Sequence, residues 1–124
     1  MLMRSLESMT YKLQFTQTAR EDLQQLHQFY QKNFSKKVAD DLVKTMQKKI
    51  AILTFSPDGG IDFNQRIGHS LIPNQVVRLF VTKKTLIFYV VQDDLVLILR
   101  LVPTKTDYLN QLENLFKVFG KSDE

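Results

Sequence analysis

The fold is decided by residues 76–102, which read VVRLFVTKKTLIFYVVQDDLVLILRLV. Three runs of β-branched, aromatic and aliphatic residues, Val76–Thr82, Leu86–Val91 and Leu95–Val102, are separated by short polar segments. Runs of this length with polar turns between them predict three consecutive antiparallel strands. Pro103 should end the last strand, because proline has no N–H to donate to a central ladder.

The middle run, Leu86–Val91, is apolar on both of its faces. A strand with two apolar faces belongs in the centre of a sheet that is covered on both sides. The cover can come from the protein's own helices or from a partner, and the sequence leaves both open.

The residues upstream of these runs predict a strand and two helices. Tyr11–Phe15 alternates with the period of a half-buried strand. Thr18 stands three residues before Glu21, the spacing of a capping box, and an amphipathic pattern follows to residues 33–34. Ser35 can cap a second helix, whose apolar stripe runs over residues 38–53. The short connection between the helices predicts an antiparallel pair.

A breaker, Ser56–Gly60, separates the helix pair from the strands, and residues 61–75 predict a loop or a short strand. After Pro103, Thr106 or Asp107 can cap a last helix with an apolar stripe up to Phe119. The whole order predicts an α+β fold: an N-terminal strand, an antiparallel helix pair, a three-stranded antiparallel meander completing a sheet, and a C-terminal helix. We expect one domain over residues 10–119, a disordered leader over 1–9 and a tail over 120–124. Translation can begin at Met1 or at Met9.

Composition narrows the class of protein. A chain of 124 residues with 44% hydrophobic and 24% charged residues suits one globular domain. The absence of cysteine excludes disulfides, thiolate zinc sites and a cysteine nucleophile, and two histidines cannot make a structural zinc site, so we expect no metal and no cofactor. No secretory signal and no membrane-spanning run is visible, which favours the cytoplasm.

The net charge of +4 is unevenly placed along the chain. Residues 35–54 carry five lysines against two aspartates, and residues 76–106 carry five basic side chains against two aspartates. The last segment, 107–124, is acidic. The basic surplus therefore lies on the second helix and on the strand region, where it indicates an acidic partner unless the lysines only solvate the surface.

Several local motifs, taken in their order, resemble the RelE/ParE superfamily of toxins from bacterial type II toxin–antitoxin modules. The resemblance covers residues 10–109 and favours the ParE-like branch. Its first part is the opening strand and helix start at 11–23, and its second is Ile52-Leu53 followed by Ser56-Pro57. Its most specific part lies on the predicted meander and consists of Arg78-x-Phe80, Leu86–Tyr89, Val96-x-Ile98-Leu99-Arg100-Leu101 and Asp107.

The resemblance implies a cytoplasmic growth inhibitor, associated with plasmid stabilisation, that a cognate antitoxin neutralises. ParE-like members bind DNA gyrase, whereas RelE-like members cleave messenger RNA on the ribosome without a metal. Thr85 and Leu86 stand where the cleaving members have an arginine, and Pro103 and Thr106 also depart from the family pattern. We therefore expect binding of a target such as gyrase, with ribosome-dependent endoribonuclease activity as the alternative.

Two sets of site residues follow. The target-binding set is Arg78, Lys83, Lys84, Arg100 and Lys105, and the catalytic set, relevant only to a ribonuclease, is Arg78, Lys105 and Tyr108. Arg78 can equally serve as a structural ion-pair partner. Arg100 lies within an apolar strand and needs a carboxylate or water, for which Asp107, Asp93 and Glu21 are candidates.

Overall fold

The computed structural model describes residues 10–121, so the expected leader, 1–9, and the last three residues of the expected tail lie outside the described part of the chain. A five-stranded sheet runs in the order β1-β5-β4-β3-β2. Its strands are β1 (Lys12–Phe15), β2 (Ile61–Asp62), β3 (Arg78–Val81), β4 (Thr85–Gln92) and β5 (Leu95–Pro103). β1 pairs with β5 in parallel, and the other neighbours are antiparallel. The predicted α+β fold and the meander are confirmed.

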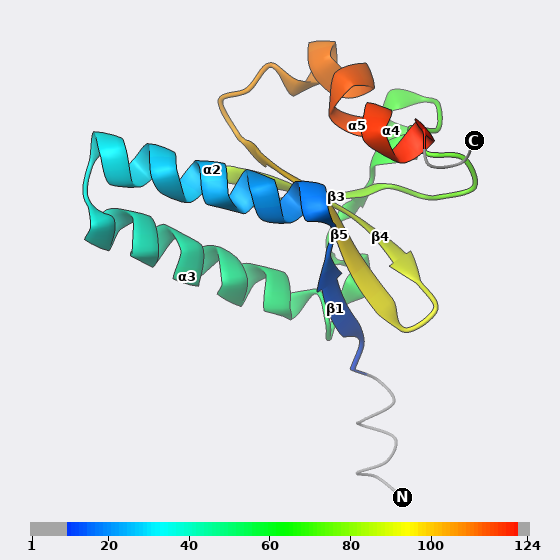
Figure 1. Cartoon of the computed structure of the whole chain (residues 1–124). Coiled ribbons are helices and arrows are strands. Elements are labelled where there is room, and N and C mark those ends of the chain that lie inside the picture. The colour runs from blue at the N-terminus through cyan, green and yellow to red at the C-terminus, as the bar shows by residue number, and fades with distance from the viewer. Residues whose placement is uncertain (1–9, 122–124) are drawn as a thin grey trace, which may run out of the picture.

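The helices are α2 (Gln17–Asn33), α3 (Lys36–Ile52), α4 (Phe63–Ile67) and α5 (Leu112–Lys121), with short 3₁₀ turns at Pro57–Gly59 and Tyr108–Gln111. Figure 1 shows α2 and α3 side by side as a hairpin, with α5 and α4 close together elsewhere on the sheet. Residues 61–75, predicted as a loop or a short strand, contain β2 and α4. Helix α5 extends two residues into the expected tail. No helix among the described residues has the length and apolar character to cross a membrane.

The helix hairpin begins at Thr16 rather than at the predicted Thr18. The Thr16 hydroxyl accepts a hydrogen bond from the Ala19 N–H at 3.0 Å and donates one to the Leu99 carbonyl at 2.9 Å. Thr16 rather than Thr18 therefore caps α2, because its hydroxyl forms hydrogen bonds with both the helix and β5. Ser35 caps α3 as predicted, by accepting from the Val38 N–H at 3.1 Å.

The two helices are also joined by a hydrogen bond between their side chains. His27 Nε2 lies 2.8 Å from Asp40 Oδ1, and Lys36 Nζ lies 3.2 Å from Asp40 Oδ2. The hydrogen bonds from His27 and then Lys36 hold the pKa of Asp40 below its ordinary value. The contact between His27 and Asp40 is partly buried, whereas the Lys36 end of the cluster is exposed and contributes little to stability.

β4 separates two apolar cores. Its side chains at Ile87 and Tyr89 pack in a cluster with α2 and α3, and those at Leu86, Phe88 and Val90 pack in a second cluster with α4 and α5. All five side chains are buried. The protein's own helices therefore cover both faces of the central strand.

The alternation of side chains between the two faces of the sheet is interrupted in the middle of β5. Phe88 pairs with Arg100 and Tyr89 with Ile98, so Leu99 is an extra residue in β5. A bulge of this kind turns two consecutive side chains toward the same side of the sheet. Beyond β1, β5 becomes an edge strand, and the bulge brings Arg100 around that edge toward α2 and α5.

Candidate functional site

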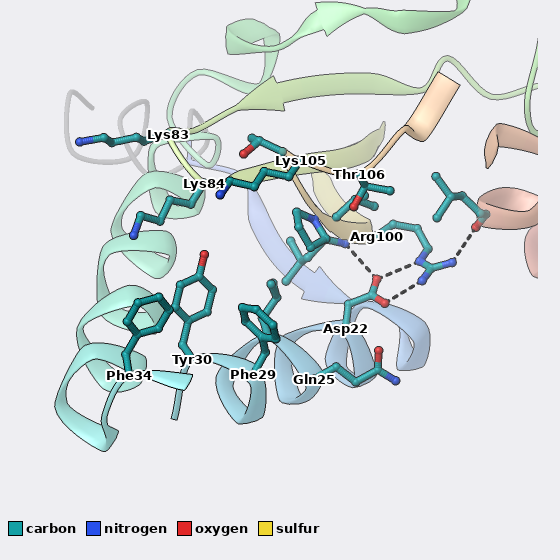
Figure 2. A pocket seen from close by; sticks show the side chains of 16 residues that line it. Asp22, Gln25, Phe29, Tyr30, Phe34, Lys83, Lys84, Arg100, Lys105 and Thr106 are labelled. Atoms are coloured by element: carbon teal, nitrogen blue, oxygen red, sulfur yellow. Dashed lines mark hydrogen bonds and ion pairs between the residues drawn. The ribbon is translucent and has the colours of Figure 1, made fainter. Parts of the chain in front are cut away.

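A groove of about 660 Å³ lies between α2, the turn from β3 to β4, and the segment that follows β5. Its walls are an aromatic row at the C-terminal end of α2 and a lysine row on the two connections, as Figure 2 shows. We call this feature the basic groove. Its volume is within the range of about 300–1,000 Å³ that is usual for ligand sites.

The aromatic row consists of Phe29, Tyr30 and Phe34. Phe29 and Phe34 are 56% and 64% exposed, although they are among the largest apolar side chains of the helix hairpin. The rings of Tyr30 and Phe34 stack at 5.6 Å between centres, and Phe29 meets Tyr30 edge-on at 5.4 Å. The contacts hold the row in place while leaving ring surface open to a partner.

The lysine row is brought together by the pairing of two connections. The turn at 82–85 is closed by the Thr82 hydroxyl, which accepts from the Thr85 N–H at 3.0 Å. The Thr104 N–H donates to the Lys84 carbonyl at 3.1 Å, which holds the segment after β5 beside this turn. Lys105 consequently lies near Lys84 in the groove, and Lys84 Nζ sits 5.3 Å from the centre of the Tyr30 ring.

The inner end of the groove is closed by an ion pair between Arg100 and Asp22. Arg100 Nε and Nη2 donate to the two oxygens of Asp22 at 2.8 Å and 2.7 Å, and Arg100 Nη1 donates to the Leu115 carbonyl of α5 at 3.0 Å. Asp22 also accepts from the buried Leu101 N–H at 3.0 Å, so it satisfies one backbone donor at the edge of β5. The partner of Arg100 is thus Asp22, and the predictions of Asp107, Asp93 and Glu21 are wrong, because the bulge and the β5 edge direct the guanidinium toward α2.

Arg78 lies elsewhere, at the start of β3, where it stabilises the loop after α3. Its Nη2 donates to the Gly60 carbonyl at 2.9 Å. Beside it, the buried Tyr89 hydroxyl donates to the Pro57 carbonyl at 2.7 Å and accepts from the Gly60 N–H at 2.9 Å. Burial raises the pKa of Tyr89, against the lowering effect of the bond to Gly60. Gly60 has no room for a side chain, since a Cβ there would lie 2.7 Å from the Tyr89 hydroxyl oxygen.

Tyr108 lies on the other face of the sheet from Arg78. Its ring packs 6.2 Å from both Phe63 and Phe88, in the core beneath α4 and α5. Arg78 shares the face of Tyr89, its partner in the ladder, which packs with α2 and α3. The predicted catalytic set of Arg78, Lys105 and Tyr108 is therefore dispersed over three places.

The target-binding set is mostly brought together. Lys83, Lys84, Lys105 and Arg100 all line the basic groove, whereas Arg78 does not. Thr85, which stands where the cleaving relatives have an arginine, is 1% exposed and lies in the core of the sheet. The geometry therefore provides a cationic, aromatic contact surface.

Sequence reasoning missed Phe29, Phe34 and Asp22. Phe29 falls off the helix stripe formed by Leu23, Leu26 and Tyr30, and a large apolar residue off such a stripe is the signal that could have found it. Asp22 belongs to the helix-start motif at 11–23, but its pairing with Arg100 was missed, because that pairing depends on the edge of a distant strand. Within residues 10–121, no three histidine, aspartate or glutamate side chains gather in a way that could hold a metal ion.

Comparison with known proteins gives one family and one fold. The family model described as the ParE toxin of a type II toxin–antitoxin system, parDE, matches residues 13–108. A solved structure titled "Chromosomal ParDE TA system from P. aeruginosa" is similar with a TM-score of 0.63 and 18% identity, over 78% of this chain and 99% of that one. At this identity the likeness concerns the fold. No curated protein matches the sequence.

Proposed function

The chain belongs to the ParE toxin family of type II toxin–antitoxin systems, and from this premise we propose that it inhibits growth by binding a macromolecular target such as DNA gyrase. A cognate antitoxin neutralises it, and both act in the cytoplasm. The toxin works by surface contact and needs no cofactor.

The observation that carries this proposal is the basic groove. Lys84 and Lys105 meet at it from two connections that are distant in sequence, and Lys83 lines its outer end. No carboxylate among the described residues forms an ion pair with any of the three. Exposed Phe29 and Phe34 stand next to these charges. Exposed aromatic rings are enriched at surfaces that bind a macromolecule, and clustered positive charge attracts an acidic one.

The dispersal of Arg78, Lys105 and Tyr108 supports binding over cleavage. A metal-independent ribonuclease needs a base for the 2′-hydroxyl, an acid for the leaving oxygen and cations for the phosphate charge, all within hydrogen-bond reach of one substrate. Arg78 is committed to the Gly60 carbonyl, and Tyr108 is packed among Phe63 and Phe88. Endoribonuclease activity is the alternative function, and the experiment below distinguishes it from binding.

The test begins with induced expression in bacteria, alone and together with a small acidic protein encoded beside this gene. We expect growth arrest that the second protein relieves. Purified toxin is then added to a gyrase supercoiling assay and, in parallel, to ribosomes translating a message that is mapped by primer extension. Inhibited supercoiling with an intact message supports the proposal. Cleaved message, or no growth defect on expression, contradicts it.

A matched pair of variants ties the activity to the groove. Lys84→Gln with Lys105→Gln removes two charges from the groove, whereas Lys44→Gln with Lys48→Gln removes two exposed charges from α3. We expect the first pair to lose growth inhibition and the second to keep it. Equal toxicity of the two double variants would show that the groove is not the contact surface.

A further inference from the structure

We propose that the basic groove binds unpaired nucleotides of a single-stranded nucleic acid, with bases against the aromatic row and phosphates against the lysine row. The inference rests on the proposed function only in using the same groove, and it adds the chemical class of the ligand. It predicts that the purified toxin binds such a strand with no gyrase or ribosome present.

The aromatic row has the features of a base-stacking platform. Phe29 and Phe34 each expose more than half of their surface, yet both are held by the Tyr30 ring between them. A stacked base needs a ring that is open on one face and supported on the other. Bases in a duplex already use their faces for stacking on each other, so such rings select unpaired bases.

The opposite wall supplies the charge that a phosphate backbone requires. Figure 2 shows Lys84 and Lys105 across the groove from Phe29 and Tyr30. Among the described residues, Asp22 contributes the only carboxylate that lines the groove, and Arg100 binds both of its oxygens. None of Lys83, Lys84 and Lys105 forms an ion pair among the described residues, so their charges can meet an external anion.

The combination of the two walls favours a nucleic acid over an acidic peptide. A carboxylate side chain would satisfy the lysines and leave the flat faces of Phe29 and Phe34 in water. A nucleotide carries an aromatic ring and an anion a few bonds apart, so one ligand residue reaches both walls. Single-stranded nucleic-acid sites commonly pair a cationic track with stacking side chains in this way.

The experiment measures binding of the full-length purified protein to labelled oligonucleotides by fluorescence anisotropy. The probes are a thymidine strand and a uridine strand of about 12 nucleotides, and a duplex of the same length. We expect either single strand to bind more tightly than the duplex. With three phosphate contacts, the logarithm of the binding constant should fall with the logarithm of salt concentration with a slope of about −2.

Four variants separate stacking from charge. Phe29→Ala and Phe34→Ala should each weaken binding by about five- to a hundredfold, and Lys105→Gln should make the salt slope smaller by about 0.7. Phe55→Ala is the matched control, because Phe55 is 70% exposed and does not line the groove. Lys48→Gln, on the exposed surface of α3, is the control for charge. Both controls should bind as the parent does.

Three results would overturn the proposal: duplex bound as tightly as single strand, Phe29→Ala and Phe34→Ala binding within twofold of the parent, or displacement of the oligonucleotide by polyglutamate at equal charge. The last would mean that the groove recognises charge alone and takes an acidic protein. Because no gyrase is present, failure here is distinct from failure in the supercoiling assay. Circular dichroism checks that each variant is folded. We expect Phe29→Ala and Phe34→Ala to fold, because both side chains are exposed.

Discussion

At the scale of single residues, Asp22 connects three elements of the fold. Its carboxylate accepts from two nitrogens of Arg100 and from the Leu101 N–H, and its side chain is only 8% exposed. Through Arg100 it also connects α2 to the Leu115 carbonyl of α5. One aspartate thus joins the first long helix, the edge of β5 and the last helix.

We expect Asp22→Asn to lower the free energy of unfolding by about 3–5 kcal/mol, because it leaves the guanidinium of Arg100 largely buried without its counter-charge. Urea denaturation measures the change. Glu21→Gln, at the exposed neighbouring position, is the control and should change stability by no more than about 0.5 kcal/mol. Similar losses for both variants would contradict a structural role of the ion pair.

Tyr89 gives a prediction about alkaline pH. Its hydroxyl bridges Pro57 and Gly60, so Tyr89→Phe should cost about 1–3 kcal/mol at neutral pH. Burial raises the folded-state pKa of Tyr89 above its ordinary value of 10.0, so the folded protein holds this proton more tightly than the unfolded chain. That stabilisation is complete below pH 10.0 and is lost as the pH rises through the folded-state pKa.

The stability gap between the parent protein and Tyr89→Phe should therefore narrow above about pH 10. Urea denaturation at a series of pH values from neutral to alkaline measures this gap, and titration of the other tyrosines and lysines cancels in the difference. A gap that stays constant across the series would mean that the Tyr89 hydroxyl is not the source of the pH dependence.

At the scale of elements, the start of α2 shows that a hydrogen bond to a neighbouring strand can decide which residue caps a helix. Thr16 and Thr18 are both good capping residues, and local spacing alone favours Thr18 with Glu21. The structure uses Thr16, whose hydroxyl also donates to the Leu99 carbonyl on β5. The tertiary hydrogen bond decides between two locally acceptable helix starts.

Thr16→Ala should destabilise the protein by about 1–2 kcal/mol, because it removes the cap of α2 and the bond to β5 together. Thr18→Ala should be neutral or slightly stabilising, since Thr18 lies inside the helix and alanine is the better helix former. Thermal unfolding followed by circular dichroism compares the two variants. A larger loss for Thr18→Ala would place the cap at Thr18 after all.

At the scale of the whole molecule, one sheet separates two cores that are covered by different parts of the chain. The helix hairpin covers one face, and α4 and α5 cover the other. The family match ends at Tyr108, so α5 lies beyond the matched region. Leu115 and Phe116 of this helix are buried against the sheet. The C-terminal helix is therefore an integral part of the second core.

Phe116→Ala tests this role of α5. Phe116 is 3% exposed and its ring meets Phe88 at 5.1 Å, so we expect a loss of about 3–5 kcal/mol in the free energy of unfolding. Val118→Ala, two residues away and 48% exposed, is the control and should stay within about 0.5 kcal/mol of the parent. Urea denaturation measures the free energy of unfolding of both variants. Equally small losses for the two would mean that α5 does not stabilise the core.

Much of the fold could be predicted from local pattern. The three strands of the meander, the Ser35 cap and the helix hairpin follow from side-chain periodicity, turn residues and capping chemistry, which act over a few neighbours. The two apolar faces of β4 predicted its central place in the sheet. The short strand β2 was one of two alternatives for residues 61–75, whereas α4 was missed, since a five-residue helix depends on the core around Phe63.

The sequence by itself determined the α+β class, the position of the central strand, the basic character of its connections and the family. Only the tertiary structure decided which side chains meet. Arg100 reached Asp22 because of a bulge at Leu99, and Lys84 met Lys105 because two connections are paired through Thr104. Arg78 and Tyr108 were separated because they lie on opposite faces of the sheet. Periodicity reports the face of each element, whereas contacts between distant segments depend on register and packing, which no local pattern contains.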